Sequence, residues 1–286
     1  MAEAHCPASC GELLQGWILG GEKLVSCPIN WYSYVSVEEG VPLGLERPRM
    51  RQMLERVLKH LDIVPEATGM LRIEYESTIP VGKGLASSTA DIAATAQATA
   101  RFYGHELSPE TLAELCVAVE PTDSTLFSSL TLFDHQTAET QISLGWAPDL
   151  KLLLLESPDV VLTEDFHKRD RRATLLAREP LLAQAWKLLT AACEQQDPQR
   201  LGEAATLSAI ASQDLLPKPG FSELHALADK GKIYGLNVAH SGSVAGLIYD
   251  DTLHDKDFIY DWIQRHQLDR FYPQVHEVSM APGGVR

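Results

Sequence analysis

Residues 80–96, PVGKGLASSTADIAATA, constrain the fold of this chain more than any other stretch of its sequence. Glycines at positions 82 and 84 free the backbone, and the alanine-rich second half is typical of a helix that begins close to Ser87. The first turn of a helix has N–H groups without internal partners and the positive end of the helix dipole. Because glycine has no Cβ, a phosphate can reach these groups. The segment therefore predicts a phosphate-binding loop followed by a rigid helix.

The same residues also fit an ordinary glycine-rich turn in which a serine caps the helix. A lone glycine motif is only a weak signal of phosphate binding. Other well-known signatures do not match. Neither the Gly-Lys pair at 82–83 nor the one at 231–232 is followed by Ser or Thr, as a Walker A motif requires. Ser87 stands where the third glycine of a Rossmann fingerprint belongs. No G-x-S-x-G sequence occurs, which argues against an α/β-hydrolase.

The charge of the chain limits its partners. The 286 residues include 24 Lys and Arg against 39 Asp and Glu, which gives a net charge of −15. Such an acidic chain repels nucleic acid and anionic membranes, so we expect neither as a partner. No apolar run reaches the length of a membrane span, and the first residues lack the basic and apolar regions of a signal peptide. A small anionic ligand in a local pocket is compatible with this charge.

The cysteines are odd in number and scattered, which suits reduced thiols in the cytoplasm better than a disulfide framework. The stretch HCPASC at residues 5–10 also allows a metal site. Structural zinc sites usually present two close cysteine pairs, however, and the chain has no second pair. We therefore expect buried thiols at all five positions, which are Cys6, Cys10, Cys27, Cys116 and Cys193.

The pattern of apolar residues predicts strands and helices that are mixed without strict alternation, which indicates an α+β fold with two lobes. Strands are expected at 25–37, 70–80 and 150–157, and two short ones around a Gly/Ser turn within 234–250. Helical spacing and capping residues predict helices at 47–63, 87–103, 108–120, 169–193 and 199–213. A composition shift at 146–149 places a domain boundary between units 1–148 and 149–286.

Three segments of the chain resemble, in order and separation, the motifs of the GHMP kinases, the family of galactokinase, homoserine kinase and mevalonate kinase. PVGKGLASS at 80–88 is similar to the signature P-x-G-x-G-L-x-S-S. CPASCGELLQG at 6–16 resembles the N-terminal motif, and HSGSVAG at 240–246 resembles the C-terminal glycine-rich motif. The resemblance covers nearly the whole chain. It implies an ATP-binding N-terminal lobe like domain 2 of ribosomal protein S5 (1–148) and a ferredoxin-like C-terminal lobe (149–286).

The resemblance also implies transfer of the γ-phosphoryl group of Mg·ATP to a hydroxyl group. It nominates Ser87 and Glu120 as ligands of Mg²⁺, which prefers oxygen. Asp123, in EPTDST, occupies the position of the family's catalytic aspartate and is expected to take the proton of the acceptor hydroxyl. A turn or capping role is the alternative for Asp123. The residues expected to bind the nucleotide are Pro80, Val81, Gly82, Lys83, Gly84, Leu85, Ala86, Ser87, Ser88 and Thr89.

Five segments are similar to the members of the family that phosphorylate L-threonine for the aminopropanol linker of adenosylcobalamin: PASCGELLQGW, SSTADIAATA, EPTDST, LGEAATLSAIASQ and GLNVAHSGSV. We therefore expect O-phospho-L-threonine and ADP as products, with homoserine as the alternative acceptor. A zwitterionic amino acid needs an acid for its ammonium group, for which Glu12 is the candidate, and donors for its carboxylate. The expected substrate-binding residues are Gly11, Glu12, His240, Ser241, Gly242 and Ser243.

The sequence disfavours two functions of other classes. A nucleotide-binding regulator without activity is disfavoured, because Ser87, Glu120 and Asp123 are all intact. A thiol- or metal-dependent hydrolase that uses Cys10 or Cys27 is disfavoured as well, because the chain has no HExxH motif and no clear Cys-His arrangement.

Overall fold

The computed structural model of the chain describes residues 1–159, 171–239 and 241–286. Its strands form one antiparallel sheet in the order β5-β4-β2-β1-β7-β8-β6-β9, and β3 also pairs with β2. The strands are β1 (Ala2–Ile18), β2 (Gly21–Glu39), β3 (Leu71–Ser77), β4 (Thr131–Phe133), β5 (Gln141–Ser143), β6 (Lys151–Glu156), β7 (Gly235–Val238), β8 (Ala245–Tyr249) and β9 (Gln274–Ser279).

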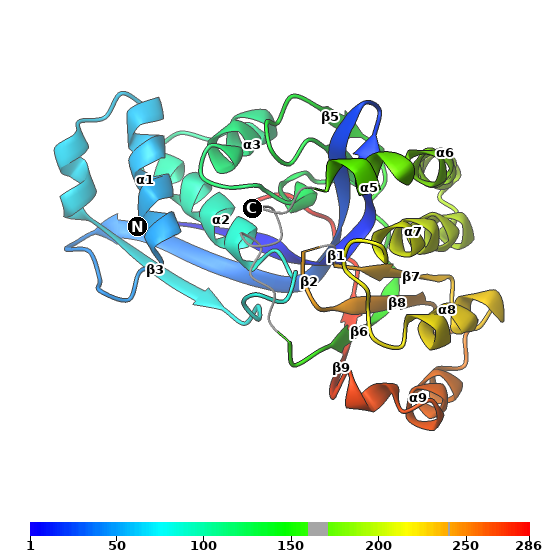
Figure 1. Cartoon of the computed structure of the whole chain (residues 1–286). Helices are drawn as coiled ribbons and strands as arrows, with labels where there is room; N and C mark the ends of the chain where they lie inside the picture. Colours follow the sequence, from blue (N-terminus) through cyan, green and yellow to red (C-terminus); the bar gives the residue numbers. More distant parts are fainter. Residues whose placement is uncertain (160–170, 240) are drawn as a thin grey trace.

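The helices pack on this sheet, and none in the described part of the chain is long and apolar enough to cross a membrane. Figure 1 shows β1 and β2 as long strands that run from the part of the molecule with α1–α3 to the part with α6 and α7. The helices are α1 (Pro48–His60), α2 (Ser87–Phe102), α3 (Pro109–Val117), α5 (Arg172–Ala177), α6 (Glu179–Gln195), α7 (Pro198–Ser212), α8 (Phe221–Asp229) and α9 (Lys256–Arg265). Short 3₁₀ helices are η1 (Pro65–Met70), η2 (Ser124–Leu126) and η3 (Leu268–Arg270).

The alanine-rich helix α2 begins at Ser87, as predicted, and is buried along almost its whole length. Small side chains make this possible, because they let α2 pack closely on β1 and β2 while α1 lies against its other side. Gly104, with φ +76°, follows the helix, and the N–H of His105 bonds to the carbonyl of Ala100 at 3.0 Å. This is the left-handed ending that glycine favours, so both predicted ends of the helix are confirmed.

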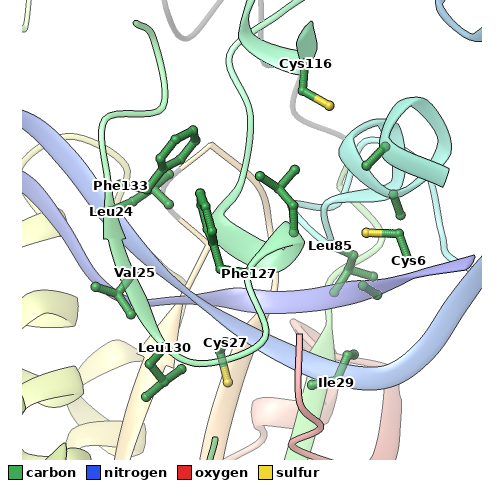
Figure 2. Close-up of a cluster of buried hydrophobic side chains, with 14 of the residues drawn as sticks. Cys6, Leu24, Val25, Cys27, Ile29, Leu85, Cys116, Phe127, Leu130 and Phe133 are labelled. Atoms are coloured by element: carbon green, nitrogen blue, oxygen red, sulfur yellow. The ribbon is translucent and has the colours of Figure 1, made fainter. Parts of the chain in front are cut away.

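Two groups of buried side chains form the core. The larger lies between β1, β2 and the helices α1–α3, α6 and α7, and the smaller lies between β6–β8 and the helices α8 and α9. All five cysteines are free and buried, as expected from their scatter. Figure 2 shows Cys6 and Cys27 within the larger core, in a cluster that also contains Leu85, Phe127 and Phe133.

Strand β1 belongs to the packing of both proposed units. It pairs with β2 along its length, and its residue Glu12 also pairs with Val238 of β7. Helices α6 and α7, which follow residue 148, pack on β1. The proposed boundary between residues 148 and 149 lies in the connection from β5 to β6.

Candidate active site

The proposed phosphate-binding loop connects β3 to α2 and has the backbone conformation that its glycines allow. Gly82 and Gly84 have φ values of +74° and +82°. Ala86, at the residue before α2, is also left-handed, with φ +57° and ψ +28°. No side chain among the described residues caps the first turn of α2. The amide groups at this helix start are therefore available to a phosphate, which meets the electrostatic requirement of an anion site.

The loop packs directly on the glycine-rich segment that follows β7. A Cβ added to Gly84 would lie 2.9 Å from the Cα of Gly242 and would also overlap the Cβ of Ala239. The N–H of Ser243 donates to the carbonyl of Lys83 at 3.0 Å. Two of the three sequence motifs thus meet, and only glycine fits at their contact. Ser241 lies in the same segment, and His240 lies outside the described residues.

Lys83 holds the loop to the end of β6. Its buried ammonium group donates to the carbonyls of Ser157 at 2.6 Å and Asp159 at 3.0 Å. Glu156 lies 3.9 Å away as an ionic partner. In this arrangement the charge of Lys83 is directed at β6, so its expected contact with the nucleotide stays a prediction.

Asp123 directs its carboxylate at α2 and β2. Thr89 Oγ1 donates to it at 3.2 Å and Ser26 Oγ at 3.4 Å. Although Asp123 precedes η2, its side chain makes no capping hydrogen bond within the described structure, which removes the capping role as its explanation. Burial raises the pKa of Asp123 to about 7, and the negative charges of Glu12 and Glu120 act in the same direction. A carboxyl group with this pKa can accept a proton at neutral pH.

Glu120 lies in the turn after α3, and the prediction that it occupies the last turn of that helix is wrong. The helix ends at Val117, and the N–H of Glu120 bonds to the carbonyl of Cys116 at 3.0 Å. The carboxylate of Glu120 accepts a short hydrogen bond from Ser88 Oγ and pairs with Arg49 at 2.6 Å. The hydroxyl that contacts Glu120 is therefore that of Ser88, the neighbour of Ser87.

These residues fit a magnesium ion bound together with a nucleotide. Carboxylate and hydroxyl oxygens are hard ligands, and Mg²⁺ usually takes only one or two carboxylates and completes its shell with phosphates and water. The described residues contain no group of three or more His, Cys, Asp or Glu side chains placed to hold a metal, so such an ion would rely on the phosphates. A cation already lies against Glu120, in the form of Arg49.

Glu12 occupies an irregular part of β1 next to Asp123. Its side chain is 5% exposed, and its cross-strand neighbour is Ser26, which bonds to Asp123. The register shifts on both sides of Glu12. Gly11 has φ +57°, and a Cβ there would lie 2.6 Å from Ala239 N, so glycine allows β1 to approach β7. The first motif is thereby brought beside the other two.

Two basic residues in this region were not identified from the sequence. Arg49, near the start of α1, pairs with Glu120, and Lys218 is buried near Glu12 and Gly242. Arg49 lies within the helix predicted at 47–63, and Lys218 lies between two prolines, at 217 and 219. Their roles depend on contacts with distant parts of the chain, for which the sequence carries no local signal.

The chain resembles proteins of one family over its full length. Residues 49–129 match the model of the N-terminal domain of GHMP kinases. The L-threonine kinase of Salmonella typhimurium is 54% identical, covering 100% of this chain and 95% of the relative. The L-threonine kinase of Citrobacter freundii is also 54% identical, covering 100% and 99%. The chain belongs to the GHMP kinase family.

The fold agrees with this membership. A mevalonate diphosphate decarboxylase from Enterococcus faecalis superposes with a TM-score of 0.72 at 16% identity, covering 100% of this chain and 98% of the other. The predicted α+β fold of a GHMP kinase is therefore confirmed. In this member of the family, the three motifs recognised in the sequence lie together around one site formed by β1, α2 and the segment after β7.

Proposed function

We propose that this GHMP kinase transfers the γ-phosphoryl group of ATP to the hydroxyl group of L-threonine, giving O-phospho-L-threonine and ADP. The observation that carries the proposal is the 54% identity, over the whole chain, to two L-threonine kinases. The product would feed the aminopropanol linker of adenosylcobalamin, as the family resemblance implies. Five free and buried thiols are consistent with a reducing compartment, so we propose a cytoplasmic location.

The nucleotide is proposed to bind at the start of α2. The amide groups of residues 87–89 face the phosphates, and the left-handed backbone at Gly82 and Gly84 allows the close approach. Glu120, with the hydroxyl groups of Ser87 and Ser88, would hold Mg²⁺, which supplies positive charge for the transferred phosphoryl group. Glu120 would hold the ion with the carboxylate that pairs with Arg49 in this structure.

Asp123 is proposed to act as the general base. Its carboxylate takes the proton of the threonine hydroxyl while the hydroxyl oxygen forms a bond to the γ-phosphorus and the bond from phosphorus to ADP breaks. Thr89 and Ser26 hold the carboxylate in place through their hydroxyl groups. Glu12, buried on β1 opposite Ser26 of β2, would pair with the substrate's ammonium group.

The activity is tested by incubating the purified protein with Mg·ATP and L-threonine, L-homoserine or L-serine in turn. ADP release and mass spectrometry of the phosphorylated amino acid are the readouts. We expect the highest kcat/KM with L-threonine, and its advantage over L-serine is about 10-fold or more, because one methyl group contributes ~1–3 kcal/mol. A higher kcat/KM with homoserine would overturn the acceptor, and ATP binding without turnover of any acceptor would favour a regulator.

A further inference from the structure

Lys218, in the connection between α7 and α8, places a buried ammonium group at the edge of the candidate site. Its side chain is 5% exposed, and Nζ donates to the carbonyl of Gly242 at 2.7 Å. Gly242 is the residue that packs on Gly84 of the phosphate-binding loop. The ammonium group therefore lies next to the contact between two of the three motifs.

The backbone around Lys218 is held on both sides. Its N–H donates to Gln213 Oε1 at 2.8 Å, and the hydroxyl group of the buried Tyr272 donates to the carbonyl of Pro219 at 3.0 Å. Prolines at 217 and 219 restrict the backbone further. The lysine is thus positioned by its surroundings, which is the arrangement expected of a binding group.

Within the described part of the chain, the ammonium group of Lys218 has the carbonyl of Gly242 as its hydrogen-bond acceptor and Glu12 as the charge that acts on it. Burial lowers its pKa to about 8, and the nearby Glu12 carboxylate opposes that shift. An ammonium group has three donors, of which the carbonyl of Gly242 takes one. A buried cation in this state gains strongly from an anion placed beside it.

Glu12 connects Lys218 to the proposed chemistry. Its carboxylate acts electrostatically on Lys218 and on Asp123, and Ser26, its cross-strand neighbour, bonds to Asp123. A buried carboxylate and a buried ammonium group are thus near enough to interact electrostatically, and the same carboxylate also acts on the proposed proton acceptor. An amino-acid zwitterion presents the complementary pair of charges.

We infer that Lys218 binds the carboxylate of the amino-acid acceptor while Glu12 binds its ammonium group. The inference rests on the proposed L-threonine kinase activity and adds a specificity-determining residue to it. Two other roles for Lys218 lead to different outcomes: contact with the transferred phosphoryl group, and neutralisation of Glu12 without any contact with substrate.

The test compares L-threonine with L-threoninamide, in which the carboxylate is replaced by a neutral amide. A charge-assisted hydrogen bond is worth ~1.5–3 kcal/mol, so we expect wild-type kcat/KM to favour L-threonine by about 10- to 100-fold. In Lys218→Met, kcat/KM for L-threonine should fall by a similar factor and that for L-threoninamide should change by less than about 3-fold. The ratio between the two acceptors then approaches one, while KM for ATP stays unchanged.

Lys187→Met, on the exposed face of α6, is the matched control and should leave every parameter unchanged. Lys218→Gln provides a second neutral variant should the Met form fail to fold. Equal losses with both acceptors would assign Lys218 to the phosphoryl group or to the fold, and would overturn the inference. A wild-type ratio near one would also overturn it, without any variant. A wild-type protein inactive on L-threonine would instead overturn the proposed function.

Discussion

Among single residues, Asp123 matters most to the proposed reaction, because the pKa of its carboxyl group suits a proton acceptor at neutral pH. Asp123 is surrounded by buried structure and by two further acids, and its pKa is raised to about 7. Such a group is a base at neutral pH and becomes a poor one below it. The same raised pKa also predicts a cost in stability, so activity and stability should respond to pH in opposite directions at this position.

Replacing Asp123 by Asn tests both effects. We expect kcat to fall by about 10²- to 10⁴-fold, the usual contribution of a general base, and wild-type kcat to rise through an apparent pKa near 7. An unfolded aspartate has a pKa of ~3.9, so between about pH 4 and 7 the unfolded chain has released this proton while the folded protein still holds it. The contribution of Asp123 to the free energy of unfolding of the wild type therefore decreases as the pH rises. Asn does not titrate, so the variant lacks this decrease.

The Tm difference between Asp123→Asn and wild type should therefore be larger at pH 8 than at pH 5, by about 2–4 °C for each ~1 kcal/mol relieved. Asp134→Asn is the matched control. Hydrogen bonds from the backbone of Thr137 and Gln136 lower the pKa of Asp134, so its stabilisation is present at neutral pH and lost in acid. Its variant should lose Tm at pH 8 and keep its kcat. Equal Tm differences for Asp123→Asn at both pH values would contradict the account.

At the scale of elements, the contact between the phosphate-binding loop and the segment after β7 is the feature on which the site depends. Gly84 and Gly104 offer a matched pair of substitutions, because both have a left-handed backbone, with φ +82° and +76°. A Cβ at Gly104 meets nothing within 4 Å, whereas one at Gly84 meets Gly242 and Ala239. Replacing either glycine by alanine therefore strains the backbone, but only the replacement of Gly84 also causes steric overlap.

Gly84→Ala should cost more stability than Gly104→Ala, whose strain is ~1–2 kcal/mol, and it should lower kcat/KM for ATP by more than about 10-fold. Gly104→Ala should leave kcat/KM within about 2-fold of wild type. Steady-state kinetics and thermal unfolding of both variants provide the measurements. Equal behaviour of the two variants would mean that the contact does not shape the nucleotide site.

Helices and strands with a strong local pattern in the sequence could be predicted, whereas those that depend on packing against distant parts of the chain could not. Helix α2 begins at Ser87 as expected because a glycine-rich turn followed by small residues has one simple interpretation. In place of the single helical region expected at 169–193, the structure has α5 and α6, which meet at Arg178 because Pro180 favours the first turn of a new helix, and α6 continues to Gln195. Residues 169 and 170 of the predicted region lie outside the described residues. The small, polar residues 6–16 gave no strand signal, yet they lie within β1, whose burial comes from packing on distant helices.

The site shows the same division. The loop and Asp123 could be nominated from the sequence because their motifs are local, and their roles stay predictions. The pairing of Ser88 and Arg49 with Glu120 depends on three separate helices or turns that meet in space. Lys218 gave no local signal, since its partners Gly242 and Glu12 are remote in the chain. Contacts of this kind follow from the fold and have no fixed spacing in the sequence.

For the molecule as a whole, the structure predicts that the first proposed unit, residues 1–148, is not stable without the second, residues 149–286. Side chains of α6 and α7, such as Leu182 and Leu201, belong to the same core as Leu13 and Leu14 of β1. Residues 1–148 alone would leave this side of β1 exposed, at a cost of ~25 cal/mol for each Å² of apolar surface. The first unit is therefore expected to depend on the second for its stability.

A fragment of residues 1–148 should be poorly soluble or should unfold without a cooperative transition, while the full chain unfolds cooperatively. Thermal unfolding followed by circular dichroism, with the full chain as the reference, provides the comparison. A sharp transition in the isolated fragment, at a Tm near that of the full chain, would show that the core is not shared in the way described.

The proposed function requires the start of α2 to hold the terminal phosphates of ATP beside Asp123 and the acceptor hydroxyl. The most direct test is a crystal structure with a non-hydrolysable ATP analogue, Mg²⁺ and L-threonine. We predict the γ-phosphate within hydrogen-bonding distance of the amide groups of residues 87–89, with the threonine hydroxyl between that phosphate and the Asp123 carboxylate. A triphosphate bound elsewhere, with the loop at 80–86 contacting only protein, would contradict the account.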